Sequence, residues 1–226
     1  IISKGIDENK DQSYALWGIS QKSLSRTIFP LGHLRKTEIR EFAGQKGFVD
    51  LINKPESYEI CFVPDNDYRG FLKRRVEGLE EKVKGGEFVL EDGTVVGHHE
   101  GYPFYTIGQR KGLGIALGYP IFVSEIQKDT NRVVLATMNE LFRDGLWAGK
   151  LTMGKYESIE KPLETVTKVR YNDPGTPAVI QQEGDKMKVH FHRGVSAIAP
   201  GQAAVFYEGN DVVGGGWISS SFRQEL

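Results

Sequence analysis

The sequence predicts an α+β protein of several domains, in which a helical part comes first and β-strands follow. Two features predict the helices: apolar residues recur at helical spacing before Gly47, and polar residues of the capping type precede these runs. One feature predicts the strands: beyond Gly78, short apolar runs alternate with glycine-containing turns. The 226 residues, 39% of them hydrophobic and 26% charged, allow one large domain or two to three small ones.

We expect three helices, over residues 11–28, 38–46 and 68–75. Asp11 is a suitable N-cap for the first, since its carboxylate can accept a hydrogen bond from the first turn. Thr37 is a suitable N-cap for the second, and Gly47 a suitable stop. Together they predict a helical unit at the start of the chain.

Strands are expected wherever apolar runs are bounded by turn residues. Asp92-Gly93 supplies the positive φ of a tight turn and predicts a hairpin of residues 87–90 and 94–96. A second pair is expected over residues 121–126 and 132–136. In the C-terminal part we expect strands over residues 163–171, 178–182, 186–191, 202–207 and 212–218. Such regular spacing predicts a sandwich or a small barrel.

Charge and hydropathy favour a soluble, cytoplasmic protein. The chain has no run of 18 apolar residues, and its first residues have no secretory-signal pattern. The formal net charge of −1 leaves no overall basic excess, so a polyanion would have to be held by local patches. Three such patches are residues 73–75, 109–111 and 168–170.

Residues 101–115 are too rich in glycine for a regular element and too aromatic and basic for an idle linker. The order of a phosphate-binding loop, G-x-x-x-x-G-K-[ST], is absent from this segment. A flexible basic loop suits RNA better, with Tyr102, Phe104 or Tyr105 available to stack on unpaired bases.

Cys61 is the only cysteine, so no disulfide can form within the chain. Ile60 and Phe62 favour a buried thiol, whereas Ser57 and Glu59 favour a polar, reactive setting. Both interpretations of Cys61, structural and nucleophilic, stay open on these residues.

Histidines offer two further kinds of site. A Cys61 partner for a small Cys–His hydrolase would be His33 or His98. Two pairs, His98-His99 and His190 with His192, could suggest a metal. The second pair has strand spacing, but no further ligand stands near it in sequence, so we expect solvent-facing histidines and no metal site.

Three segments together resemble one family, the bacterial tRNA-specific 2-thiouridylases, which place sulfur on the wobble uridine of tRNA. They are N-K-D-Q-S-Y at residues 9–14, S-Y-E-I-C-F at 57–62 and Y-T-I-G-Q-R-K-G-L-G at 105–114. Supporting matches lie at residues 29–32, 169–171, 200–207 and 214–216. The resemblance covers nearly the whole chain.

The resemblance implies three domains. Residues 1–72 would be the C-terminal part of an α/β ATP-pyrophosphatase domain, residues 73–142 a small β-rich central domain that contacts tRNA, and residues 143–226 an antiparallel β-barrel. The family's ATP-binding region has no match here, so we expect a C-terminal portion that lacks it.

The resemblance also implies a reaction. In the family, ATP adenylates the C2 oxygen of uridine 34, and a persulfide on the second of two catalytic cysteines delivers sulfur. Cys61 matches that second cysteine, and Phe62 would lie near the target base. The first cysteine, which would release the product by forming a disulfide with Cys61, is absent. A sulfur-relay protein or cysteine desulfurase would supply the persulfide, and the chain, a monomer, would be inactive alone.

The family's tRNA contacts carry over to six residues: Lys10, Asp11, Gln12, Arg170, Tyr171 and Gln202. Structural alternatives are an N-cap for Asp11, an exposed strand charge for Arg170 and a turn residue for Gln202. Glu59 departs from the small residue expected there, and an inward carboxylate would raise the pKa of the neighbouring thiol. The competing function is a non-catalytic RNA-binding β-barrel module with a structural cysteine.

Overall fold

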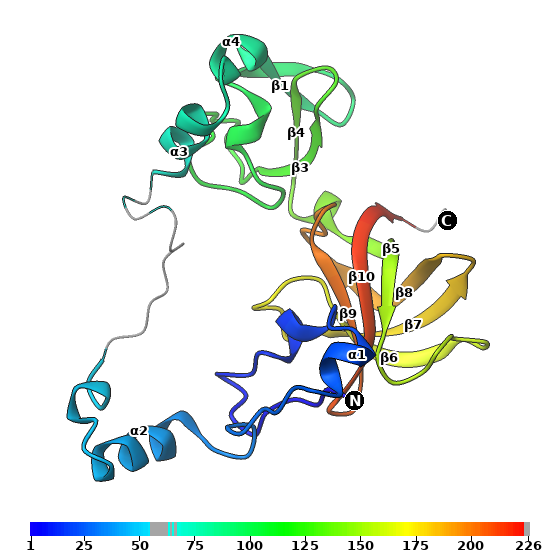
Figure 1. Cartoon of the computed structure of the whole chain (residues 1–226). Coiled ribbons are helices and arrows are strands. Elements are labelled where there is room, and N and C mark those ends of the chain that lie inside the picture. Colours follow the sequence, from blue (N-terminus) through cyan, green and yellow to red (C-terminus); the bar gives the residue numbers. More distant parts are fainter. Residues whose placement is uncertain (55–62, 64, 66, 224–226) are drawn as a thin grey trace. The chain divides into compact units, whose positions relative to one another are not determined.

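The computed structural model describes residues 1–54, 63, 65 and 67–223, and the chain divides into two compact units (Figure 1). The barrel unit comprises residues 1–55 and 143–226, and the central unit comprises residues 56–142. Cys61, Phe62 and Glu59 lie outside the described residues.

Six antiparallel strands form a closed barrel in the order β10-β5-β8-β7-β6-β9. The strands are β5 (Arg143–Met153), β6 (Leu163–Lys168), β7 (Thr176–Glu183), β8 (Lys186–Val195), β9 (Ala203–Glu208) and β10 (Asp211–Phe222). The predicted α+β class is therefore confirmed, with a barrel rather than a sandwich. All five expected C-terminal strands are present, whereas β5 was not predicted.

Alternation along the strands builds the barrel interior. On β8, Met187, Val189 and Phe191 are buried, and the residues between them are more exposed. They pack with Leu146 and Phe206 from other strands. Full burial of each such side chain contributes about 1.5–3 kcal/mol, so the interior supplies much of this unit's stability.

The helices of the barrel unit are short. They are a 3-10 helix (Ser13–Leu16), α1 (Gln21–Leu24), α2 (Lys36–Gln45) and a second 3-10 helix (Val49–Leu51). The prediction of one helix over residues 11–28 is wrong: Gly18 interrupts it, and the ring of Trp17 is buried against the barrel. The second expected helix is confirmed as α2. In the described part of the chain, no helix combines the length and apolar character that a membrane crossing requires.

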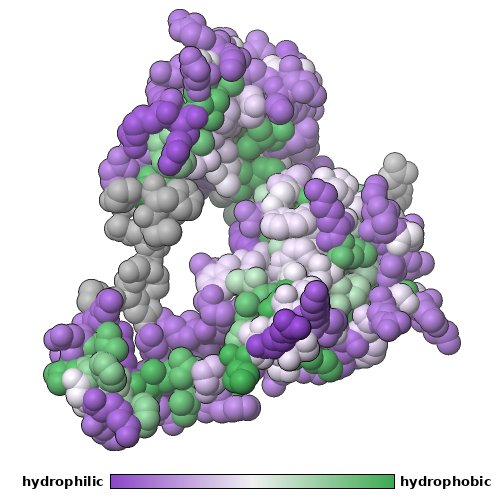
Figure 2. All heavy atoms as spheres, in the orientation of Figure 1, coloured by the Kyte–Doolittle hydropathy of each residue, from purple (hydrophilic) through white to green (hydrophobic). Residues whose placement is uncertain are grey.

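Residue 35, not Thr37, caps α2. The Arg35 backbone N–H donates to the Glu38 carboxylate at 2.6 Å. No α2 side chain is buried, and apolar side chains gather on and around this helix (Figure 2). The exposed ones include Ile28, Phe29, Leu31, Leu34, Phe42, Phe48, Val49 and Leu51. Contiguous exposed apolar patches of this kind are uncommon on monomeric soluble proteins.

In its described residues, the central unit has a four-stranded sheet in the order β2-β1-β4-β3 and two α-helices. Its elements are α3 (Tyr68–Arg75), α4 (Leu79–Val83), β1 (Gly86–Leu90), β2 (Val95–His99), β3 (Phe122–Gln127) and β4 (Arg132–Ala136), with 3-10 helices Tyr102–Phe104 and Asn139–Leu141. The expected helix and both hairpins are confirmed, and Gly93 has the predicted positive φ of 86°. The parallel pairing of β1 with β4 was not predicted.

The loop of residues 101–115 contributes to the core of the central unit. Phe104 and Tyr105 are only 5% and 9% exposed and pack with Phe88, so the prediction of stacking on RNA bases is wrong for these two rings. For Tyr102, which is partly exposed, it stays a prediction. The loop also pairs with β3, because the Gly108 N–H donates to the Val123 carbonyl at 2.7 Å. Gly101, Gly108, Gly112 and Gly114 of this loop adopt positive φ, a conformation that glycine allows without strain.

Candidate nucleic-acid interface

The first residues of the chain lie on the outside of the barrel, along β9 and β10 (Figure 1). The Val212 N–H donates to the Ile2 carbonyl at 2.9 Å, and the Lys4 N–H donates to the Asn210 carbonyl at 2.8 Å. Ile2, Tyr14 and Trp17 are buried against an apolar patch of outward-facing residues, Ala203, Val205, Tyr207 and Val212. The N-terminal segment therefore adds a second core to this face.

Asp11 organises the segment around its carboxylate. Oδ1 accepts from the backbone N–H groups of Gly5 at 3.1 Å and Ser13 at 3.2 Å, and Oδ2 accepts from the Ser13 hydroxyl at 2.6 Å. These bonds tie the residues before and after Asp11 to one carboxylate. A carboxylate so engaged is suited to shaping the loop, and it carries the wrong charge for a phosphate contact.

Gln12 and Tyr171 meet although 159 residues separate them. The Gln12 Nε2 donates to the Tyr171 hydroxyl at 2.6 Å, and that hydroxyl donates to the Asp11 carbonyl at 3.2 Å. The Tyr171 ring packs edge-on against Tyr14, with centroids 6.1 Å apart. Three residues that the family resemblance selects thus form one contact.

Buried hydroxyl groups next to the Gln12–Tyr171 contact form hydrogen bonds that hold the N-terminal segment on the barrel. The Tyr14 hydroxyl donates to the Ala203 carbonyl at 2.8 Å, and the Ser13 and Tyr207 hydroxyls lie 3.1 Å apart. Burial raises the pKa of Tyr14 and the pKa of Tyr207 to about 12, so both keep their protons at neutral pH. Sequence reasoning missed Ser13, Tyr14 and Tyr207 as supporting residues, since only their partners in the fold reveal the role.

Three cationic side chains, Lys4, Lys168 and Arg170, lie on the same face of the barrel. The Lys4 and Lys168 ammonium groups lie 4.6 and 5.9 Å from the centroid of the Tyr207 ring. Arg170 is exposed at the end of β6, in a turn that Asp173 fixes by accepting from the backbone N–H groups of Val169 and Gly175. Cationic groups on a face with exposed polar side chains suit a phosphate backbone.

Lys10 and Gln202 complete the predicted set. Lys10 is partly exposed and Gln202 is exposed. The Gln202 carbonyl accepts from the Ile218 N–H at 2.8 Å, so its backbone is fixed while its side chain is free to reach solvent. The structure therefore joins Asp11, Gln12 and Tyr171 directly, and it places Gln202 next to Ala203, the partner of Tyr14.

Other candidate sites receive less support. His33 and His98 are exposed, and His192 pairs with Glu164 at 2.8 Å. The expectation of a solvent-facing ring is wrong for His99, which is buried against Phe88. Within the described ranges, no three His, Cys, Asp or Glu side chains come together as a metal site. The hydrolase prediction depends on Cys61 and stays a prediction.

The basic run at the end of α3 is largely balanced by nearby acids. Lys73 pairs with Glu80 at 2.6 Å, and Arg74 pairs with Asp65 at 3.2 Å. The hydrogen bond that the Lys73 ammonium donates to the Glu80 carboxylate raises the pKa of Lys73. This patch of the central unit therefore offers less free positive charge than the sequence suggests.

Three family profiles match consecutive parts of the chain. A tRNA methyl transferase HUP domain profile matches residues 1–65, and a tRNA methyl transferase PRC-barrel domain profile matches residues 69–137. An aminomethyltransferase beta-barrel domain profile matches residues 143–218. The third match agrees with the closed barrel of β5 to β10.

Curated relatives match almost the entire chain. The tRNA-specific 2-thiouridylase MnmA of Amoebophilus asiaticus is 72% identical over 225 residues, which are 99% of this chain and 60% of that protein. The MnmA proteins of Cytophaga hutchinsonii and Salinibacter ruber are 72% and 52% identical, covering 100% and 96% of this chain and 61% and 57% of their own lengths. The chain thus spans about three fifths of the length of these relatives. By its sequence, the chain belongs to the family of tRNA-specific 2-thiouridylases.

Proposed function

We propose that these residues are the part of a tRNA 2-thiouridylase that binds the tRNA and carries, on Cys61, the sulfur destined for C2 of uridine 34. The observation that carries the proposal is the contact of Asp11 and Gln12 with Tyr171 on the outside of the barrel. It supports a single binding surface built from two distant segments. The exposed Arg170 and Gln202 and the partly exposed Lys10 extend this surface for the phosphates and bases of one tRNA.

The sulfur chemistry is a persulfide transfer. The terminal sulfur of the Cys61 persulfide attacks C2 of a uridine whose C2 oxygen is adenylated, and AMP leaves with that oxygen. A second thiolate then attacks the inner sulfur of Cys61. A disulfide forms, the bond to the transferred sulfur breaks, and its electron pair stays on the 2-thiouridine. Phe62, the neighbour of Cys61, would lie near the extruded base.

The residues present do not fit ATP. The sequence contains neither a Ser-Gly-Gly-x-Asp-Ser loop nor a second cysteine. A phosphate site at a helix start needs free backbone N–H groups, but the Ser20 side chain already caps α1, and Glu38 occupies the first turn of α2. We therefore assign the adenylation to no residue of this chain. The 226 residues alone bind tRNA without thiolating it, as a cytoplasmic monomer that takes sulfur from a cysteine desulfurase or relay protein.

The test loads the chain with sulfur and offers it tRNA. After incubation with a cysteine desulfurase and cysteine, mass spectrometry should find one additional sulfur atom on Cys61 and none in the Cys61→Ser variant. Labelled tRNA should bind both proteins, and added ATP should yield no 2-thiouridine. Formation of 2-thiouridine by the chain alone would contradict the proposed inactivity.

The second candidate, a non-catalytic RNA-binding module, is favoured by one observation: the contact of Gln12 with Tyr171 is made without any cysteine. The alkylation rate of Cys61 separates the two functions. Rapid labelling of the native protein supports the sulfur carrier, because a reactive thiolate must be accessible. Labelling only after denaturation, together with intact tRNA binding, supports the module with a structural cysteine.

A further inference from the structure

Trp217 is a large aromatic side chain on the outer face of the barrel. It is 48% exposed, whereas its neighbours on β10, Gly216 and Ile218, are buried. The alternation of the strand therefore points Trp217 toward solvent. Tryptophan is enriched among the residues that contribute most to binding where a protein contacts a partner.

The ring of Trp217 is supported from one side. It packs edge-on against Trp17, with centroids 5.6 Å apart and planes at 75°. Trp17 in turn lies against Gly215, where an added Cβ would come within 2.8 Å of the Trp17 ring. The exposed ring is thus held in place before any partner arrives, which lowers the entropy lost on binding.

Trp217 also continues the candidate interface. It lies opposite Ala203 in the β9–β10 pairing, and the Ala203 carbonyl accepts from the Tyr14 hydroxyl. Tyr14 packs against Tyr171. Gln202, a predicted tRNA contact, directly precedes Ala203. An unbroken set of contacts therefore links Trp217 to Tyr171.

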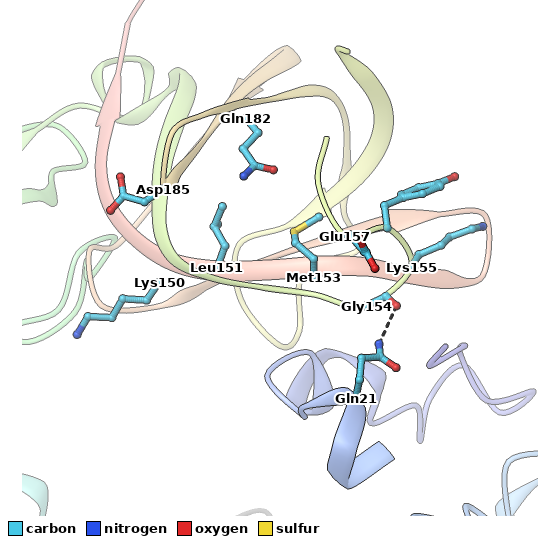
Figure 3. Close-up of a pocket in the computed structure, with 10 residues that line it drawn as sticks. Gln21, Lys150, Leu151, Met153, Gly154, Lys155, Glu157, Gln182 and Asp185 are labelled. Carbon is cyan, nitrogen blue, oxygen red and sulfur yellow. Dashed lines mark hydrogen bonds between the residues drawn. The ribbon is translucent and has the colours of Figure 1, made fainter. Parts of the chain in front are cut away.

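The other side of Trp217 is open. In the β10–β5 pairing it lies opposite Gly149, and a Cβ added there would meet nothing within 4 Å. Lys150 follows at an irregular point of the pairing with a φ of 50°, and it lines a cavity of about 810 Å³ that β5, the segment after it, the β7–β8 turn region and α1 enclose. Figure 3 shows the Lys150 ammonium extending away from the other lining side chains, while Gln21 donates to the Gly154 carbonyl at 2.9 Å.

We propose that an unpaired base of the tRNA stacks on Trp217 and that Lys150 contacts an adjoining phosphate. The proposal rests on the proposed function, because it extends the same tRNA surface. An exposed indole next to open space suits a base, since every base presents a π-face. Lys150 directly follows Gly149, which lies opposite Trp217 in the β10–β5 pairing, and a cation at that position suits the backbone that follows the base.

The experiment measures binding of a fluorescein-labelled tRNA by fluorescence anisotropy between about 50 and 200 mM salt. Trp217→Leu retains an apolar cover for Trp17 but loses the stacking platform, and Trp217→Phe keeps a ring. Trp147→Leu is the matched control, because Trp147 is partly buried and has Lys188 above its ring. Lys150→Gln tests the phosphate contact. Urea unfolding checks that each variant folds.

Trp217→Leu should weaken binding by about tenfold, with an unchanged dependence on salt, because stacking releases no counterions. Trp217→Phe should retain most of the affinity, and Trp147→Leu should retain wild-type affinity. Lys150→Gln should reduce the slope of log K against log salt by about 0.7–0.9. Equal affinities for Trp217→Leu and the wild type, or an equal slope for Lys150→Gln, would overturn the corresponding contact. A wild-type chain that binds no tRNA would instead remove the proposed function itself.

Discussion

The three hydrogen bonds on the Asp11 carboxylate lead to a quantitative prediction for Asp11→Ala. A hydrogen bond to a charged group contributes about 1.5–3 kcal/mol, but three bonds on one partly exposed carboxylate do not add fully. We expect the variant to lose about 2–4 kcal/mol of the free energy that holds the N-terminal segment on the barrel. Asp11→Asn keeps the Oδ1 acceptor for the Gly5 and Ser13 N–H groups, so it should lose much less.

Amide hydrogen exchange followed by NMR measures this loss at the two donors. In Asp11→Ala the Gly5 and Ser13 amides should exchange faster, by roughly 30- to 1000-fold, the factor equivalent to about 2–4 kcal/mol. The control is Glu8→Ala, which removes the same charge from an exposed position nearby. It should leave both exchange rates unchanged.

The tRNA affinity of these variants tests the role assigned to Asp11. If the carboxylate only shapes the loop, Asp11→Asn binds tRNA like the wild type. If the carboxylate contacts tRNA directly, both Asp11 variants lose affinity while exchange at Gly5 and Ser13 stays slow. That second result would refute the reasoning.

Two further predictions concern packing and pH. Gly215→Ala should unfold at lower urea concentration and expose Trp17 fluorescence to quenchers, because the new Cβ would come within 2.8 Å of both the Trp17 ring and the Ala204 carbonyl; unchanged fluorescence would contradict this packing. Burial lowers the pKa of His99, whose Nδ1 accepts from the Gly101 N–H at 3.0 Å, so the folded central unit favours the neutral ring. Its contribution to stability should be complete above the ordinary pKa of about 6.5 and fall as the pH drops below it. The midpoint of unfolding should therefore decrease at lower pH, and it should depend less on pH in the His99→Gln variant than in the wild type.

Turns and strands that depend on short stretches of sequence were predicted correctly. The Asp92-Gly93 turn and the alternating residues of β8 follow from backbone preferences and from one buried face. The strand β5 was missed because its glycines, including Gly145 and Gly149, hide the alternation. Gly145 is needed where the Phe222 ring and the Val189 carbonyl leave no room for a Cβ, and that crowding exists only in the folded barrel.

The candidate site was predictable in composition but not in arrangement. The family resemblance selected Gln12 and Tyr171, yet nothing local indicates that they meet. The helix expected over residues 11–28 failed for the same reason: burial of Tyr14 and Trp17 on the barrel outweighs helix propensity. Phe104 and Tyr105 show the converse error, in which an apparently exposed loop supplies core residues.

Docking of the N-terminal segment and binding of tRNA are linked through the same residues. If tRNA binds only the docked state of the segment, the apparent tRNA affinity equals the intrinsic affinity multiplied by the fraction of molecules in which the segment is docked. Burial of Tyr14 and Trp17 contributes about 1.5–3 kcal/mol each, so a loss of about 2–4 kcal/mol in Asp11→Ala leaves much of the segment docked. Hydrogen exchange should therefore change far more than tRNA affinity in that variant. If further substitutions also remove the Tyr14 and Trp17 rings, tRNA affinity should change more than hydrogen exchange does. The docked fraction would then limit the binding of tRNA.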